Sequence, residues 1–375
     1  MKRKIGEFIK EYSVRNTDDE DIPVYSVTNE NGFCTGYFSK DVSSKDRTTY
    51  KIVPRGCFAY NPSRINVGSI DWQNCDNRVI VSPLYVVFEV SDELDRQYLL
   101  HYLKSDVANA FIRANGAGSV RDNLRFKALS DIPIQMVPVE EQREIVKKID
   151  NVSNLIRKGE TIIEELDQLV KSRFVEMFGN PADSSNMNSV ELYEICNKIT
   201  DGEHGSVARV PNGHPFLNAK HITKNGRIDW DTITFIGDED HQRIYRRCNP
   251  EEGDILLTTT GTIGNVAIMP KHEEVSMDRG ITLLKINRQR VTSEFVAEML
   301  KQPAVQTEMG ANVHASAIGH LFMNKVKKLP AIVPSMDEQV EFTDFVKQVV
   351  KSKYCVKNDL LRCLLLQVLN NSYRR

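Results

Sequence analysis

Two stretches of the chain carry nearly the same pattern of apolar and polar positions. Residues 132–146 read IPIQMVPVEEQREIV, a short apolar segment with prolines, followed by acidic residues that open a helical pattern. Residues 329–342 read LPAIVPSMDEQVEF, with the same features in the same order. Carboxylates suit the first turn of a helix because the helix dipole is positive there. Each stretch therefore predicts a short strand followed by the start of a helix.

A long apolar stripe follows each of these stretches. In the first stripe Gly159 occupies the one position where an apolar residue is missing, and in the second Lys353 interrupts the pattern. A mean spacing of 3.5 residues is typical of a coiled-coil seam. We predict two long helices that pack against each other. The predicted helix–helix or subunit interface consists of Ile145, Ile149, Val152, Ile156, Ile163, Leu166, Val170, Phe342, Val346, Val349, Val356 and Leu360.

The two patterns belong to a longer internal repeat. Identical residues stand 197 positions apart from the pair Gly56 and Gly253 to the pair Gln142 and Gln339. The identities are sparse, but strand, helix, loop and junction patterns follow in the same order in both halves. Solenoid repeats have periods of about 20–50 residues, so a period this long indicates a duplicated domain.

Each half has the same predicted anatomy. A strand-rich segment, such as GDILLTTTGTIGNVAIMP at 253–270, precedes a short helix at 94–112 or 293–309, for which Ser293 is a candidate N-cap. The predicted fold class is α+β (mixed α/β), with two pseudo-repeated globular domains separated by two long antiparallel coiled-coil helices. The predicted boundaries are 1–139 for the first domain, 140–178 for its helix, 179–336 for the second domain including a linker at 179–189, and 337–375 for the second helix.

The composition is that of an ordinary soluble globular protein. The chain has 375 residues, of which 41% are hydrophobic and 27% charged. The first residues resemble no signal peptide, and no apolar run reaches the roughly 18 residues that a membrane span needs. The 7 cysteines lack zinc-site spacing. We expect a cytoplasmic protein with reduced cysteines and no membrane partner. Its net charge of −2 argues against binding nucleic acid by bulk charge alone.

Catalytic motifs are not visible in the sequence. It contains no phosphate-binding P-loop and no nucleophile elbow. YNPSR at 60–64 is faintly similar to the Asn-Pro-Pro-aromatic motif of adenine methyltransferases, but it lacks the second proline and the aromatic residue. Dispersed histidines, among them His204, His214 and His241, favour surface positions over a metal site. We therefore predict no catalytic residue, no metal ligand and no cofactor-binding residue.

Several segments of the sequence resemble those of a known protein family. The junction IPIQMVPVEEQREIVKKID resembles that of the DNA-specificity subunits of type I restriction–modification systems, as LPAIVPSMDEQVEF does more loosely. GDILLTTTGTIGNVAIMP is similar to the family's Gly-Asp-Ile-Leu segment. In the first half RGCFAYNPSR replaces that segment, which is a departure from the family pattern.

The resemblance implies a noncatalytic subunit. Its two target-recognition domains would each read one half of a split, asymmetric site in double-stranded DNA. It would bind two methyltransferase (modification) subunits and, with them, restriction subunits. S-adenosylmethionine, ATP and Mg would belong to those partners, and none to this chain.

Two other readings remain open. One is a single-chain DNA methyltransferase or nuclease with an unrecognised catalytic site, which a methyl-transfer assay on the isolated protein would reveal. The other is a coiled-coil scaffold, which would leave no sequence-selective footprint on DNA even with every partner present.

Base edges in the major groove are read by Arg, Asn, Gln, Lys and small hydroxyl residues. The loops at 114–123 and 311–320 precede the two junctions at matched positions and differ in chemistry, as two different half-sites would require. The DNA-binding candidates in the first domain are Arg64, Asn66, Arg78, Asn115, Arg121 and Arg125. Those in the second are Lys220, His221, Thr259, Thr260, Arg279, His314, Ser316 and His320.

Overall fold

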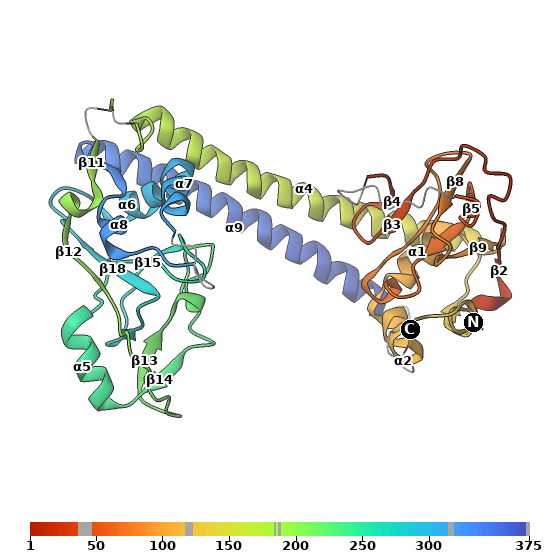
Figure 1. The fold of residues 1–375 in the computed structure, drawn as a ribbon, viewed down its shortest axis with the longest axis horizontal. Coiled ribbons are helices and arrows are strands. Elements are labelled where there is room, and N and C mark those ends of the chain that lie inside the picture. Colours follow the sequence, from red (N-terminus) through yellow and green to blue (C-terminus); the bar gives the residue numbers. More distant parts are fainter. Residues whose placement is uncertain (37–46, 117–122, 184, 187–188, 314–318, 373–375) are drawn as a thin grey trace. The chain divides into compact units, whose positions relative to one another are not determined.

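The computed structural model describes residues 1–36, 47–116, 123–183, 185–186, 189–313 and 319–372. The chain forms two compact units, Met1–Leu155 and Ile156–Arg375, and Figure 1 labels their elements. The boundary between the units falls inside one long helix, α4 (Val139–Phe178).

The first unit consists of short strands followed by short helices. Its strands are β1 (Lys2–Lys4), β2 (Ile9–Glu11), β3 (Ser26–Thr28), β4 (Gly32–Cys34), β5 (Lys51–Pro54), β6 (Phe58–Tyr60), β7 (Ile70–Trp72), β8 (Arg78–Val81), β9 (Val86–Val90) and β10 (Pro133–Gln135). Its helices before α4 are α1 (Arg96–Leu103), α2 (Asp106–Gly116) and α3 (Phe126–Ser130), with 3-10 turns η1 (Ile5–Glu7) and η2 (Ile65–Val67).

The second unit has the same order of elements with additions. Its strands are β11 (Ser189–Glu191), β12 (Cys196–Asp201), β13 (His214–Leu217), β14 (Thr234–Ile236), β15 (Ile255–Thr258), β16 (Val266–Ile268), β17 (Ser276–Met277), β18 (Ile281–Ile286) and β19 (Pro330–Ile332). Its helices are α5 (Asp238–Cys248), α6 (Ser293–Leu300), α7 (Pro303–Ala311), α8 (Met323–Lys327) and α9 (Met336–Ser372), with 3-10 turns η3 (Leu192–Ile195) and η4 (Ala219–His221).

Sheet topology confirms that the two halves share one fold. The first unit has a 4-stranded antiparallel sheet in the order β2-β9-β6-β7, and the second has one in the equivalent order β12-β18-β15-β16. The helices α1 and α6 begin 197 positions apart, as do α3 and α8. The predicted mixed α and β class, with its internal repeat, is therefore correct.

The halves differ in the strands added beside these sheets. In the first unit β3 pairs with β4 and β5 pairs with β8, each as a two-stranded antiparallel sheet. In the second unit β13 lies between β14 and β17, and α5 packs against β17. The duplicated elements thus form a common frame to which each half adds its own structure.

The apolar stretch of each junction forms a short strand, β10 in the first unit and β19 in the second. Residues of β10 pair antiparallel with β1, so that Lys4 stands opposite Pro133, and β19 pairs with β11 in the same way, with Glu191 opposite Pro330. The backbone N–H of Ile5 donates to the carbonyl of Ile132 at 2.9 Å. Each junction therefore joins the last strand of a unit to its first strand before the long helix begins.

The short helix predicted in each half is in fact two helices. In the second half Pro303 occupies the first turn of α7, and a proline has no N–H with which to continue α6. In the first half the hydroxyl of Ser105 accepts from the N–H of Ala108 at 3.3 Å and begins α2. The N-cap of α6 is Thr292, whose hydroxyl accepts from the N–H of Phe295, so the expectation of Ser293 as the cap was wrong by one residue.

A buried glutamine fixes the start of each long helix. The Oε1 of Gln142 accepts from the N–H of Asp95 at 2.8 Å, and its Nε2 donates to the carbonyls of Glu93 and Val137 at 3.0 and 2.8 Å. Its side chain is fully buried. One amide therefore satisfies backbone groups on two separate segments.

Gln339 repeats this arrangement in the second unit. Its Oε1 accepts from the N–H of Thr292 at 2.9 Å, and its Nε2 donates to the carbonyls of Arg290 and Pro334 at 2.9 and 3.0 Å. It is also fully buried. All partners of Gln339 lie 197 positions after those of Gln142, so the repeated Glu-Gln letters record a repeated set of hydrogen bonds.

The two long helices run antiparallel where both belong to the second unit. Gly159 of α4 lies against Leu360 of α9, whereas Arg173, farther along α4, pairs with Glu341 near the start of α9 at 3.1 Å. Between these contacts the ammonium group of Lys353 pairs with the carboxylate of Asp167. Lys353, which interrupts the apolar stripe in sequence, is therefore ion-paired across the seam.

The predicted interface residues are all buried or half-buried. Val170, Phe342 and Val349 are buried in one cluster with Phe174, and Leu166 and Val346 pack against that cluster. Half-buried positions complete the stripe at Ile145, Ile149, Val152, Ile156, Ile163, Val356 and Leu360.

Gly159 belongs to this seam, although the sequence has no apolar side chain at that position. Its position is buried, and a Cβ placed on it would lie 2.5 Å from Cδ1 of Leu360. The absence of a side chain at Gly159 is what allows Leu360 to approach the backbone of α4. The sequence pattern shows a missing apolar residue, but the close contact depends on the facing helix.

Replacing Gln339 by alanine should destabilise the second unit. The N–H of Thr292 and the carbonyls of Arg290 and Pro334 would lose their partner, and an unsatisfied buried group costs about 1–3 kcal/mol. Thermal or urea unfolding measures the loss. Gln348→Ala, at an exposed position of the same helix, is the matched control. Equal midpoints for the two variants would contradict the role of Gln339.

Replacing Gly159 by leucine should weaken the helix pair. Leucine favours helix over glycine by about 1 kcal/mol, but overpacking against Leu360 costs about 1–3 kcal/mol. The double variant Gly159→Leu/Leu360→Ala should recover stability because the facing side chain has been shortened. Thermal unfolding of the two variants, with Glu160→Leu as a neighbouring exposed control, checks this. A single Gly159→Leu variant at least as stable as the parent would show that no close approach is needed there.

Candidate nucleic-acid interface

In each unit the same two segments are held together beside the sheet. The N–H of Leu124 donates to the carbonyl of Pro62 at 3.1 Å, which joins the segment before α3 to the loop after β6. In the second unit the N–H of Leu321 donates to the carbonyl of Thr259 at 2.8 Å. Leu124 and Leu321 are both buried and anchor these segments in their cores. The backbone frame is therefore equivalent in the two halves.

A pair of polar side chains stands next to each of these backbone bonds. In the first unit the hydroxyl of Ser63 donates to Oδ1 of Asn123. In the second unit Oγ1 of Thr260 lies 2.7 Å from Nδ1 of His320, and the backbones of these two residues form an antiparallel bridge. Each member of one pair is 197 positions from its counterpart. The frame is thus repeated, whereas the chemistry that it presents differs.

The second unit gathers further groups around His320. Burial lowers the pKa of His320, the positive charge of Arg279 lowers it further, and Asp201 opposes these effects. The ring of Phe322 meets the imidazole edge-on with centroids 4.7 Å apart. Because its pKa lies below the ordinary value, His320 is a neutral imidazole at neutral pH, with one N–H donor and one acceptor nitrogen.

Backbone hydrogen bonds join the strand ends next to Arg279. The N–H of Arg279 donates to the carbonyl of Glu203 at 2.9 Å, and the N–H of Thr259 donates to the carbonyl of Gly280 at 2.8 Å. The side chain of Glu203 pairs with Arg243 of α5. The cluster therefore lies where β12, β15 and β17 end and β18 begins.

The first unit presents a different set at the equivalent place. Arg64 precedes η2 and Arg125 precedes α3, and both side chains are exposed. Asn66 is half-buried within η2. Arg125 is the counterpart of Phe322 by the repeat offset. In the sequence Arg64 follows Ser63, and Arg125 stands two residues after Asn123. The second unit has the aromatic ring of Phe322 at the position of Arg125.

Several candidates have structural roles instead. His221 is fully buried, its Nδ1 accepts from the N–H of Asn218 at 3.1 Å, and burial lowers its pKa. The side chain of Thr259 is buried with its hydroxyl 3.3 Å from that of Thr282. The expectation that His221 and Thr259 read bases is therefore corrected, since neither side chain is accessible. Lys220, next to His221, remains exposed.

Asn115 and Arg78 are also committed to partners within the protein. Nδ2 of Asn115 donates to the carbonyl of Phe111 at 2.9 Å, and Asn312 makes the equivalent bond at the end of α7. Arg78, on β8, pairs with Glu20 through both of its terminal nitrogens. Both residues are exposed, so their contact with DNA stays a prediction. Arg121, His314 and Ser316 lie outside the described residues.

The sequence reasoning missed Ser63, Asn123 and Phe322. Thr260 and His320 were candidates, and subtracting the repeat offset of 197 leads directly to Ser63 and Asn123. Adding the same offset to Arg125 leads to Phe322. The signal was therefore present, but only once each candidate was transferred between the halves.

His241, Ser276 and Glu274 resemble a hydrolytic triad, but the serine hydroxyl is buried. His241 lies 2.9 Å from the hydroxyl of Ser276 and 3.2 Å from the carboxylate of Glu274. Ser276 and His241 are both buried, so no substrate reaches the hydroxyl.

Within the described parts of the chain, no three His, Cys, Asp or Glu side chains form a group suited to a metal ion. Among the helices described, none is long and apolar enough to cross a membrane.

Comparison with known proteins follows the same two-part division. The sequence matches the family described as type I restriction modification DNA specificity domain over residues 3–168 and again over residues 185–361. The chain is 22% identical over 345 residues to the type I restriction enzyme EcoBI specificity subunit of Escherichia coli, covering 83% of this chain and 72% of that protein. It is 24% identical over 259 residues to a putative specificity subunit, S.HindORF215P, of Haemophilus influenzae, covering 66% of this chain and 62% of that protein.

A solved structure shares the fold. A chain from a study of complex assembly and conformational transition of the type I R-M system superposes with a TM-score of 0.63 at 15% identity, covering 98% of this chain and 95% of that one. At this level of identity the likeness concerns the fold alone.

Proposed function

This chain belongs to the family of type I restriction–modification DNA specificity domains, and on that premise we propose that it reads a split, asymmetric target in double-stranded DNA, one half-site per unit. The observation that supports the proposal is the equivalent placement of Ser63–Asn123 and Thr260–His320 on one repeated backbone frame. Equal frames present different donor and acceptor groups, as two different half-sites require.

The chemistry of both clusters suits base edges. Amide, imidazole, hydroxyl and guanidinium groups form the hydrogen bonds by which bases are distinguished in the major groove. The net charge of −2 supplies little sequence-independent attraction to phosphates. In the proposed assembly, partner subunits therefore contribute much of the grip on the DNA backbone, and this chain contributes selectivity.

The proposed role is noncatalytic, with the chemistry assigned to partners. Methyltransferase subunits would carry S-adenosylmethionine, and restriction subunits would use ATP and Mg. Domain limits of 1–139 and 179–336, with long helices at 140–178 and 337–375, remain our proposed division of the chain. A single-chain methyltransferase or nuclease, or a DNA-independent scaffold, has no specific observation in its favour.

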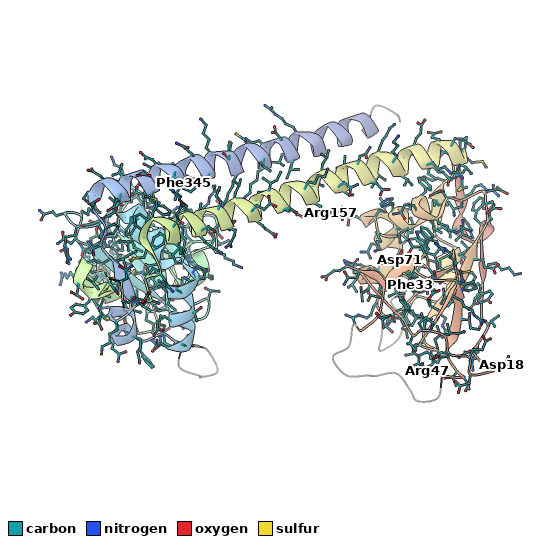
Figure 2. The ribbon with its side chains drawn as sticks, turned by 90° about the horizontal axis from the view of Figure 1, so that it is seen from above. Asp18, Phe33, Arg47, Asp71, Arg157 and Phe345 are labelled. Atoms are coloured by element: carbon teal, nitrogen blue, oxygen red, sulfur yellow. The ribbon has the colours of Figure 1, made fainter. Side chains whose placement is uncertain are left out.

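The long helices offer a surface for the methyltransferase partners. Leu155, Ile162 and Leu169 recur every seven residues on α4 and are 48%, 42% and 48% exposed. A groove of about 770 Å³ between α4 and α9 is lined by Leu169 and Phe345 and also by polar and charged residues such as Arg173 and Glu341. Figure 2 labels Phe345 on α9. A second apolar stripe beside the coiled-coil seam is a surface to which a helix of another chain can pack. This stripe is not repeated on α9, where Ser352 and Asp359 stand 197 positions after Leu155 and Ile162. The proposal of two methyltransferase copies therefore rests on the duplicated halves of the chain.

The first test of this proposal is exchange of one half. Replacing residues 1–139 by the corresponding segment of a relative should change one half of the methylated motif and leave the other half intact. Methylation-aware sequencing of host DNA, with the partner subunits co-expressed, reads both halves at once. The reciprocal exchange of residues 179–336 is the matched control. A simultaneous change in both halves would contradict one half-site per unit.

The second test concerns stoichiometry. Native mass spectrometry of the co-expressed complex should show two methyltransferase subunits per specificity chain. The double variant Ile162→Glu/Leu169→Glu places charges on the exposed apolar stripe and should reduce that occupancy. Glu164→Lys, on an exposed polar position of the same helix, should leave it unchanged. A complex that retains one methyltransferase at saturating partner would oppose the two-copy arrangement.

A further inference from the structure

The side-chain pairs Ser63–Asn123 and Thr260–His320 have one feature in common. In each, a hydroxyl on the loop after β6 or β15 contacts a planar polar group on the segment before α3 or α8. The planar group is Asn123 in the first unit and His320 in the second. Asn123 is exposed and His320 is half-buried, and both belong to segments that the buried Leu124 and Leu321 anchor. The hydroxyl therefore helps to fix the orientation of the planar group.

Resting on the proposed function, we propose that Asn123 and His320 are equivalent specificity-determining residues, with Asn123 reading an adenine in the first half-site and His320 reading a guanine in the second. The two residues occupy one position in the repeated frame, so each reads the base pair at the equivalent place in its own half-site.

The orientation of Asn123 leads to adenine. Ser63 donates its hydroxyl proton to Oδ1 of Asn123, which directs the amide NH2 group away from Ser63. Oδ1 keeps a second lone pair. The amide can then donate from Nδ2 to N7 of adenine and accept at Oδ1 from the N6 amino group, which is the bidentate pairing of asparagine with adenine. A guanine would place its O6 acceptor opposite Oδ1, and two acceptors repel.

The surroundings of His320 lead to guanine. Oγ1 of Thr260 lies 2.7 Å from Nδ1 of His320, and in this proposal we assign the hydroxyl as the donor. The single proton of a neutral imidazole then resides on Nε2, which becomes a donor. Arg279, an exposed residue between β17 and β18, adds further donors in this proposal. Guanine presents two acceptors, N7 and O6, in the major groove, whereas adenine presents an acceptor and a donor. Donors on both side chains match guanine and reject the amino group of adenine.

Phe322 supports this orientation. Its ring meets the imidazole of His320 edge-on and limits rotation about the side-chain bonds. The corresponding residue of the first unit is Arg125, which offers no such packing. The second unit therefore holds its reading group by a hydroxyl, a backbone bridge and an aromatic contact.

Reciprocal substitutions test the assignment in the complete complex. The chain is co-expressed with its methyltransferase and restriction partners, and the methylated motif is read by sequencing DNA from the host cell. His320→Asn should shift one base pair of the second half-site from guanine toward adenine, with a loss of about 5- to 150-fold in selectivity for the original base. Asn123→His should shift the equivalent base pair of the first half-site from adenine toward guanine. Lys224→Asn, an exposed position of the second unit outside the cluster, is the matched control.

A second variant keeps the test valid if His320→Asn does not fold. Thr260→Val retains the shape of the side chain but removes its hydroxyl, so selectivity should fall at the base pair that His320 reads and nowhere else. A motif unchanged in both His320→Asn and Thr260→Val, or a change confined to the opposite half-site, would overturn the inference while leaving the proposed function intact. A parent complex that methylates no split motif would overturn both.

Discussion

The start of each long helix depends on one buried amide. Gln142 and Gln339 each bond to the chain before the short helix of their unit and to the proline-bounded turn before their own helix. Without these bonds, backbone groups before the short helix and before the long helix would lose their partner, which is costly in a protein interior. The direction in which each long helix leaves its unit therefore follows from a few hydrogen bonds. The strand pairing of β1 with β10, and of β11 with β19, closes the same region.

The duplication explains which identities persist between the halves. Gly56 and Gly253 both have positive φ, at 88° and 83°, and both carbonyls accept a side-chain bond from the first residue of the following helix. Identical residues thus mark places where backbone geometry or backbone hydrogen bonds are shared. The residues beside the repeated backbone bonds, by contrast, have diverged. A frame that is satisfied by its own bonds leaves these neighbouring positions free to change chemistry.

Much of this architecture could be predicted from the sequence because it rests on periodic or repeated patterns. The mixed fold, the duplicated domain and the paired long helices follow from the 197-residue offset and the apolar stripes. The burial of His221 and the close contact at Gly159 could not be predicted, because both depend on segments that are distant in sequence. Pro303 indicates the break between α6 and α7, but the apolar residues on both sides of it favour one continuous helix. The repeat offset relates Asn123 to His320 in the sequence, but their hydrogen bonds to Ser63 and Thr260 depend on the fold.

The arrangement of charge supports a separation between holding DNA and reading it. Near His320 the carboxylates of Asp201 and Glu203 are paired with Arg247 and Arg243, so these acids are neutralised within the protein. Arginines used in this way offer little extra attraction to phosphates, and the whole chain is close to neutral. Selectivity is a ratio between the correct sequence and all others, and a strong phosphate grip raises both. If partner subunits supply most of that grip, changes at the reading positions alter the recognised sequence with little effect on assembly. A reading surface that contributes little to the fold can then diverge in each half independently, as the Ser63–Asn123 and Thr260–His320 pairs have done.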